Sequence, residues 1–412
     1  MFTSFSTALS ALGAHSTAVD VVGNNLANLN TPGFKASSVA FYDLVTQSLG
    51  AGLGETQVGF GVARPITLRQ FSQGGIQASS GPLDAAIQGD GFLVVRNQAN
   101  QIVYTRGGSL QVDKAGNLLT ATGEKIQGWT EVNGVLDTNS AVGDIVVPVG
   151  SLKAPQPSTE FSFDMNLNAA APAGTKFSTS IEVYDSLGSS HIVSVNFTKS
   201  AANTWDYTVS IPDSDVVTPP APNVSGQLIF DDGGRLDLTA TTPPDPLTIP
   251  AGELTTGAAA LELNWLLANG TVPRLTQFAE PSAVSANAQD GSPAAQLIRV
   301  GLANGGQVLA QYSNGQQIVV GQLAMASVRN PESLVSIGNN NYQLSARSAL
   351  PAVGLPGTGG RGTIIGGAIE NSTVDIAREF TNLIVLQRGY QANSRVVTTV
   401  DELSQETINL KR

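Results

Sequence analysis

The last stretch of the chain, residues 374–410, carries an apolar stripe whose length limits what the chain can fold into. The stripe steps by three and four residues, slips once by one position and then continues, which places it along one face of an α-helix. Its members are Ile376, Phe380, Leu383, Gln387, Tyr390, Ser394, Val397, Val396, Val400, Leu403, Thr407 and Leu410. At about 1.5 Å per residue the helix would be roughly 55 Å long. A single small domain does not cover that length, so the stripe predicts a partner.

The residues before this helix favour a capped start. Asn371, Ser372 or Thr373 can accept a hydrogen bond from a free backbone N–H group, and Asp375 suits the positive end of the helix dipole. Gly389, in the middle of the helix, is expected to weaken it by about 1 kcal/mol relative to alanine.

The first thirty residues predict the partner helix. A second stripe with steps of three and four contains Phe2, Phe5, Leu9, Leu12, Ser16, Val19, Val22, Leu26 and Leu29. Small or polar residues lie between these positions, and Asp20 is the only formally charged residue before Lys35. A helix with so little charge does not suit free solution. The residues leave two possibilities open: an N-terminal helix packed on its own domain, or terminal helices that form an intermolecular coiled coil or bundle.

Composition excludes several classes of partner. Charged residues make up 13% of the 412 residues, about half the usual share, and the formal net charge is −11. A chain with no basic stripe does not displace counterions from nucleic acid, and it does not adhere to anionic lipid. A length of 412 residues predicts two or three compact units, and 44 glycines and 21 prolines predict many turns.

The chain has no cysteine, which excludes disulfides, thiolate zinc sites and cysteine nucleophiles together. No stretch reaches eighteen apolar residues, so no membrane span is expected. The first residues lack the basic segment and the continuous apolar run of a signal peptide. If the protein is exported, we expect a route that does not cleave an N-terminal signal.

A run rich in asparagine and glycine ends the first helix, which is assigned to residues 1–30. Pro32 disfavours helical backbone at Thr31, and Gly33 can adopt positive φ, so the chain is expected to change direction there. Residues 31–70 are interpreted as an extended linker. The glycine-spaced segment 50–54 could resemble a phosphate cradle, but no lysine follows it and no helix opens after it.

From residue 71 the pattern becomes β. Four segments share a turn chemistry of Asp or Asn followed by Gly, which closes strands into hairpins, at residues 112–118, 184–188, 230–236 and 312–315. Proline-rich seams divide this region. We assign residues 71–147 plus 290–358 to a middle β domain, 148–289 to an inserted outer β domain, and 359–412 to a hinge and the C-terminal helix. The predicted fold class is mainly β with terminal α-helices, nested around a helical coiled-coil domain.

A search for catalytic residues finds little. His15 and His191 are isolated in sequence and do not make a zinc site, so each is interpreted as a satisfied or surface imidazole. No Gly-x-Ser-x-Gly motif supports a nucleophile elbow. Residues 231–233 lack the spaced oxygen ligands of a calcium loop and are read as a hairpin. No enzyme activity, cofactor or metal is predicted, although a glycosidase-like carboxylate pair stays open.

Three blocks of sequence, in order along the chain, resemble the flagellar rod and hook family of bacterial axial proteins. The first block contains Gly23, Asn24, Asn25, Ala27, Asn28, Thr31, Pro32, Gly33, Phe34 and Lys35. The second lies at residues 89–92 and 104–108, and the third covers residues 367–375, 387–393 and 408–411. Residues 184–188 and 204–206 are similar to the outer domain of the family's hook members, and the length of the chain agrees with them.

The resemblance implies a structural subunit that self-polymerises, under a cap, into a curved flexible tube. Such a tube is a universal joint that transmits torque from rod to filament in motility. The terminal helices would form the inner tube through Phe2, Phe5, Leu9, Leu12, Val19, Leu26, Ile376, Phe380, Leu383, Tyr390, Val397, Leu403 and Leu410. The implied partners are further copies of the chain, rod and hook–filament junction proteins, the hook cap and the flagellar type III export apparatus. The implied location is the cell exterior.

Three alternatives make different predictions. An adhesin would be a free, stable monomer with ordered termini. A distal rod protein would have an outer domain too small for residues 150–280. An extracellular carbohydrate-active enzyme would have a cleft with converging carboxylates in the same segment.

Overall fold

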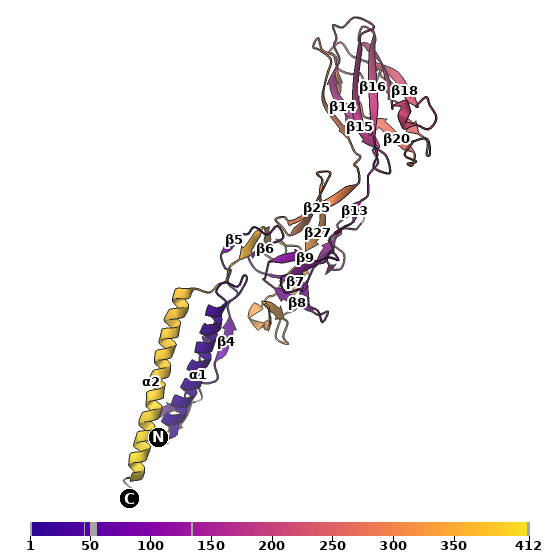
Figure 1. Cartoon of the computed structure of the whole chain (residues 1–412). Helices are drawn as coiled ribbons and strands as arrows, with labels where there is room; N and C mark the ends of the chain where they lie inside the picture. Colours follow the sequence, from indigo (N-terminus) through magenta and orange to yellow (C-terminus); the bar gives the residue numbers. More distant parts are fainter. Residues whose placement is uncertain (1, 45, 50–55, 133–134, 410–412) are drawn as a thin grey trace. The chain divides into compact units, whose positions relative to one another are not determined.

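The computed structural model describes residues 2–44, 46–49, 56–132 and 135–409 (Figure 1). It is mainly β, with helix α1 (Phe2–Ala27) at one end of the chain and helix α2 (Ile376–Asn409) at the other. The predicted fold class is confirmed. The chain divides into two compact units, the first made of residues 1–149, 299–311 and 317–412, and the second of residues 150–298 and 312–316.

The two helices lie side by side within unit 1 (Figure 1). Helix α2 starts later than expected, because the cap is Asp375, whose Oδ1 accepts hydrogen bonds from the N–H groups of Ala377 (2.9 Å) and Arg378 (3.1 Å). The expected cap at residues 371–373 was wrong. Thr373 is engaged elsewhere, since its Oγ1 accepts from the N–H of Ala36 at 2.9 Å.

The segment assigned to an extended linker contains paired strands. Strand β1 (Ser37–Ala40) pairs antiparallel with β4 (Ile66–Arg69), and β2 (Thr46–Leu49) pairs antiparallel with β3 (Thr56–Gly59). This ribbon is attached to α1, because the Oγ of Ser10 accepts from the N–H of Val62 at 3.2 Å. The glycine-spaced segment 50–54 lies outside the described residues.

The β part of unit 1 is built on one sheet whose central strand order is β27-β11-β7-β8-β30-β29. Its inner face carries Phe92, Tyr104, Trp129 and Tyr342, all buried in one core. The strands before the excursion into unit 2 are β5 (Ile76–Ala78), β6 (Ala85–Gln88), β7 (Phe92–Arg96), β8 (Ile102–Thr105), β9 (Leu110–Val112), β10 (Leu118–Thr120), β11 (Lys125–Thr130) and β12 (Gly143–Asp144).

After the excursion the chain crosses between the units within β25 (Ala295–Leu302) and β26 (Gln307–Tyr312). The remaining elements of unit 1 are β27 (Gln317–Leu323), β28 (Met325–Ser327), the 3-10 helix η2 (Pro331–Ser333), β29 (Val335–Gly338), β30 (Asn341–Gln343), β31 (Ala352–Gly354), β32 (Thr363–Gly366) and β33 (Ala368–Glu370). The expected hinge from residue 359 thus contains two strands, which pair with β6 and β5.

Unit 2 is β apart from one short 3-10 helix, and it has its own core. A four-stranded antiparallel sheet, in the order β15-β16-β17-β18, faces a mixed sheet in which β14 lies between β20 and β24. In β17 every second residue is buried, which is the period of a strand packed on one face. The elements are β13 (Leu152–Lys153), β14 (Glu160–Asn166), β15 (Lys176–Tyr184), β16 (Ser190–Ala201), β17 (Thr204–Ser210), η1 (Asp213–Asp215), β18 (Asn223–Ile229), β19 (Leu247–Ile249), β20 (Leu261–Trp265), β21 (Ala268–Asn269), β22 (Val272–Pro273), β23 (Leu275–Thr276) and β24 (Ala283–Gln289).

The four predicted hairpin turns are confirmed. Strands pair antiparallel across each of them: β9 with β10, β15 with β16, Phe230 with Leu236, and β26 with β27. The Asp side chains work as predicted, because Asp113 Oδ1 accepts from the N–H groups of Ala115 and Asn117 at 2.9 and 2.7 Å.

Candidate functional site

The apolar side chains of α1 that are buried within one chain are mostly small. The buried apolar residues of α1 are Ala8, Ala14, Ala18 and Val22. His15 lies against Gly389 of α2, where an added Cβ atom would be 2.7 Å from His15 Cε1. Gly389 is therefore more than the weak point we expected, because any larger residue must displace the imidazole.

His15 differs from its interpretation as a satisfied or surface imidazole. Its Nδ1 is buried and has no hydrogen-bond partner among the described residues, and its ring lies 5.7 Å from the ring of Phe41. The imidazole serves as a flat packing group between α1, α2 and the ribbon.

Many of the large apolar residues predicted for assembly are exposed in the single chain. There are six of them: Phe5, Leu9, Ile376, Phe380, Tyr390 and Leu403, with Leu9 56% exposed. Those in partly buried positions are Leu12, Val19, Leu26, Leu383 and Val397. The side chain of Phe2 and all of Leu410 lie outside the described part of the chain.

Three apolar residues of α2 that are not members of the predicted stripe are also exposed: Ile384, Val385 and Ile408. They lie beside the stripe, so the apolar surface of α2 is broader than a single stripe with heptad-like spacing suggests. An exposed apolar surface of this kind marks an interaction site.

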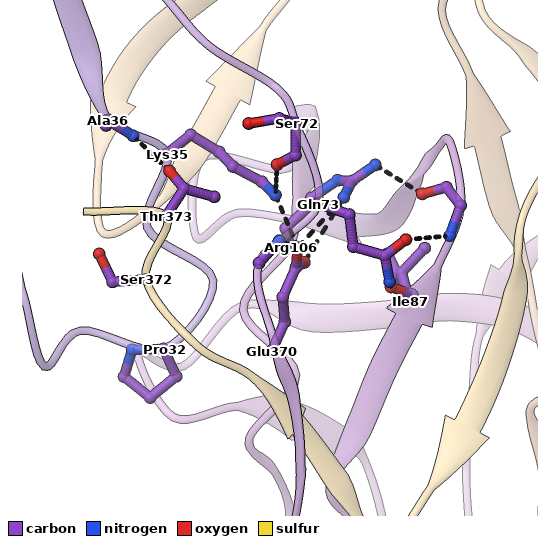
Figure 2. A network of polar contacts seen from close by, with 12 residues as sticks. Pro32, Lys35, Ala36, Ser72, Gln73, Ile87, Arg106, Glu370, Ser372 and Thr373 are labelled. Carbon is purple, nitrogen blue, oxygen red and sulfur yellow. Dashed lines mark hydrogen bonds and ion pairs between the residues drawn. The ribbon is translucent and has the colours of Figure 1, made fainter. Parts of the chain in front are cut away.

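A buried polar junction holds both ends of the chain at the β part of unit 1 (Figure 2). The Nζ atom of Lys35 lies 2.7 Å from Glu370 Oε1, and each side chain is 1% exposed. Lys35 Nζ also donates to the carbonyl of Ser72 at 2.6 Å. The N–H of Gly74 donates to Glu370 Oε1 at 2.8 Å. One carboxylate thus ties the segment after α1 to the segment before α2.

Arg106 completes the junction from the end of β8. Its Nη1 lies 3.5 Å from Glu370 Oε2, while its Nε and Nη2 donate to the carbonyls of Gly91 (3.0 Å) and Gly89 (2.9 Å). Burial lowers the pKa of Lys35, the charge of Arg106 lowers it further, and the hydrogen bond and charge of Glu370 oppose both effects. The arrangement holds charges in place and presents no nucleophile to a substrate.

The residues of the N-terminal signature surround this junction. Asn25 is fully buried, and its side chain makes two hydrogen bonds with the backbone of Ser37, at 2.7 and 3.0 Å. Gly33 has φ +70°, and an added Cβ atom would lie 2.6 Å from the carbonyl oxygen of Arg106. Phe34 packs in a small core with Ala36 and Val374. These contacts explain why the turn needs an amide, a glycine and an aromatic side chain.

The other signature residues have lighter roles. Asn28 donates to the carbonyl of Asn24 at 2.9 Å and accepts from the hydroxyl of Thr31 at 3.1 Å. The carbonyl of Pro32 accepts from the side chain of Asn340 at 2.9 Å. Gly23 and Ala27 are exposed on α1.

Sequence reasoning did not pair Lys35 with Glu370, which are 335 positions apart. A signal was present in the charge pattern. Lys35 is the only charged residue between Asp20 and Asp43, and Glu370 is alone in the run between Arg361 and Asp375. Isolated charges in otherwise uncharged runs are candidates for burial with each other, because a buried charge needs a partner.

A second polar cluster lies in unit 2, around His191. Its Nδ1 is 3.0 Å from Asp215 Oδ2 and its Nε2 is 3.3 Å from Asp185 Oδ2, so the imidazole is satisfied as expected. Thr256 Oγ1 also donates to Asp185 Oδ2 at 2.7 Å. The cluster braces the β15–β16 turn. In the described residues, no group of three or more His, Asp or Glu side chains is arranged to hold a metal ion.

Among the described helices, neither is long and apolar enough to cross a membrane.

Four family models match successive parts of the chain. They are described as flagella basal body rod protein (residues 5–35), flagellar hook protein FlgE/F/G D1 domain (86–169), flagellar basal body protein FlaE D2 domain (151–292) and flagellar basal body rod FlgEFG protein C-terminal (365–410).

Relatives named flagellar hook protein FlgE match over the whole length. That of Treponema pallidum is 30% identical and that of Borreliella burgdorferi 32%, each with 100% of both chains covered. That of Salmonella typhimurium is 31% identical, covering 99% of this chain and 100% of the relative. A solved structure of Helicobacter pylori flagellar hook protein FlgE2 shares the fold, with a TM-score of 0.52 and 14% identity over 70% of this chain and 99% of that one.

Proposed function

This chain belongs to the flagellar hook protein family and is a structural hook subunit rather than an enzyme, and we propose that copies of it join through α1 and α2 into a curved flexible tube. The tube acts as a universal joint that passes torque from rod to filament in motility. The distal rod alternative is not favoured, because relatives that cover the full chain are hook proteins.

This proposal rests on the different exposure of small and large apolar side chains on the two helices. Small residues of α1, such as Ala14 and Ala18, are buried within one chain, while Leu9, Phe380 and Tyr390 are exposed. A helix pair that leaves its largest apolar side chains in water is stabilised when other copies cover them. We propose that the apolar residues predicted for the inner tube, which lie on α1 and α2, make this contact between copies.

The junction of Lys35, Arg106 and Glu370 supports torque transmission. A pair of helices that carries force must be attached to the rest of its subunit, and a buried, hydrogen-bonded ion cluster is a specific attachment. The proposed nested order is an inner helical domain, a middle β domain and an outer β domain inserted at residues 148–289, which unit 2 supports.

Family membership also supports partners at the two ends of the tube. We propose rod proteins at one end, hook–filament junction proteins at the other, and the hook cap during growth. The proposed location is the hook at the cell exterior, reached through the flagellar export apparatus without cleavage of a signal peptide. N-terminal sequencing of the protein from purified hooks tests the last point, with an intact start expected.

Negative-stain electron microscopy of the purified full-length protein tests the main proposal. We expect curved tubes to form as the concentrations of protein and of a kosmotropic salt such as sulfate are raised, because such salts strengthen apolar burial. A folded protein that stays monomeric under all these conditions contradicts it.

A further inference from the structure

A cavity of about 250 Å³ lies between α1, α2 and the first strand of the ribbon. Its walls are apolar and polar in equal measure, and the apolar part includes Val22, Phe41 and Leu386. Its charged residues come from the first turns of α2, Asp375, Arg378 and Glu379. The cavity is thus a slot with an apolar stem region and a charged region, which suits a long side chain with a charged tip.

Glu379 is the unexplained residue of this cavity. It is 8% exposed, and its Oε2 is buried without a hydrogen-bond partner among the described residues. Asp375 is already engaged as the cap of α2. Arg378 makes no ion pair with Glu379 within the part of the chain that the structure describes. A buried carboxylate oxygen without a partner is unfavourable, so Glu379 is a site that lacks its cation.

The helix that would lie beside this site in another copy carries suitable cations. Arg388 and Arg395 are exposed on α2, and neither belongs to an ion pair formed by the described residues. They are seven residues apart, so they project from nearly the same face. They follow Glu379 by nine and sixteen residues, which corresponds to axial shifts of about 14 and about 24 Å between parallel helices.

We propose that the cavity receives an arginine from α2 of a second copy, Arg388 or Arg395, whose guanidinium pairs with Glu379. This inference rests on the proposed function and names the partner of one site within it. Arginine fits better than lysine, because its planar group can donate two hydrogen bonds to one carboxylate. The pairing makes a feature that is unfavourable in a lone subunit favourable in the polymer.

The first test is Glu379→Gln in the full-length protein, which should have opposite effects on the lone subunit and on the polymer. In the monomer we expect amide hydrogen exchange in α1 and α2 to be unchanged or slower, since a buried unpaired charge is removed. In the polymer we expect the critical concentration to rise at least about tenfold, as loss of a buried charge pair predicts. Faster exchange in the monomer assigns Glu379 a purely internal role and overturns the proposal, as does an unchanged critical concentration.

The second test uses charge reversal in separate chains. The Glu379→Arg chain and the Arg388→Glu/Arg395→Glu chain should each polymerise poorly alone. Their equimolar mixture should polymerise at a lower total concentration than either, because each chain supplies the charge that the other's site lacks. Failure of the mixture to improve on the single chains overturns the proposal.

The matched control is Glu402→Arg, which makes the same charge change at an exposed position of α2. It should raise the critical concentration much less than Glu379→Arg, and an equal rise overturns the proposal. Unmodified protein is measured in parallel. If it forms no tubes, the proposed function itself fails. If it forms tubes that Glu379 variants do not alter, only this inference fails.

Discussion

Lys35 and Glu370 show at the residue scale how two distant, isolated charges become one structural unit. Each side chain is 1% exposed. The Glu370 carboxylate pairs with Lys35, accepts a hydrogen bond from the backbone N–H of Gly74 and lies near the guanidinium of Arg106. Removing one member of a buried pair leaves an uncompensated charge, whereas the intact pair is only modestly stabilising. Removing one partner should therefore lower the free energy of unfolding by a measurable amount.

Lys35→Met should lower the free energy of unfolding of unit 1 by about 3–5 kcal/mol, because Glu370 keeps only Gly74 and the more distant Arg106. Urea denaturation followed by circular dichroism measures the change. The matched control is Lys114→Met on an exposed hairpin turn, expected within about 0.5 kcal/mol of the unmodified protein. Equal effects of the two substitutions would contradict the assigned role.

The His191 cluster predicts a loss of stability of unit 2 in acid. Burial raises the pKa of Asp185, but hydrogen bonds from Thr256, the Ser189 backbone, His191 and the Leu187 backbone outweigh it, so the net pKa is lowered. A depressed carboxyl pKa stabilises the fold above the unfolded-state value of about 3.9, and this contribution is lost as pH falls further. Stability should therefore decline below about pH 4.

Tryptophan fluorescence measures this decline, because Trp205 and Trp265 are both buried in unit 2. A Trp129→Phe background removes the third tryptophan, which lies in unit 1. Asp185→Asn should flatten the dependence on pH between about 2 and 4 while lowering stability at pH 7. An unchanged slope would show that other carboxyl groups control the acid transition.

At the scale of elements, the helix pair shows where periodicity predicts well and where it misleads. Steps of three and four correctly predicted that both termini are helical, because local spacing determines which side chains share a face. They did not predict that Ala14 and Ala18 are the buried positions of α1 or that Gly389 lies against His15, since close approach between elements selects the smallest side chains.

The effect of Gly389→Ala on the stability of α2 should change sign with the residue at position 15. Alone, it should loosen the helix pair, because the new methyl group overlaps the imidazole of His15. Combined with His15→Ala, it should stabilise α2 by up to about 1 kcal/mol through helix propensity. Hydrogen exchange of α2 amides in the four chains of this cycle measures both effects. The same sign in both backgrounds would contradict the close contact.

The exposed stripe predicts variants that separate folding from assembly. Leu9→Gln and Phe380→Gln should change the monomer's unfolding free energy by less than about 0.5 kcal/mol, since both side chains are already exposed. Their critical concentrations should nevertheless rise, because the proposed contact between copies would bury both. The control is Leu350→Gln, at a position 90% exposed in the β part of unit 1, which should leave assembly unchanged. A matching rise for Leu350→Gln would place the effect outside the helices.

At the scale of the whole molecule, the junction decides where the ends can be removed. A deletion from residue 370 would take away Glu370 and Thr373, both engaged with the segment that follows α1. We therefore expect a chain ending at residue 375 to keep a folded β part, with cooperative unfolding, while losing the ability to form tubes. A chain ending at residue 369 should be clearly less stable. Tubes from the shorter chains, seen by negative stain, would contradict the role of α2.

The sequence by itself determined the terminal helices, the hairpin turns, the absence of cysteine chemistry and the resemblance to an axial protein family. All of these depend on spacing and composition within short windows. The tertiary structure alone decided that Lys35 meets Glu370, that Gly389 admits His15, and that the segment after α1 pairs into strands instead of remaining a linker. The physical reason is that burial and charge pairing depend on which distant segments the folded chain brings together, and local pattern carries no information about that distance.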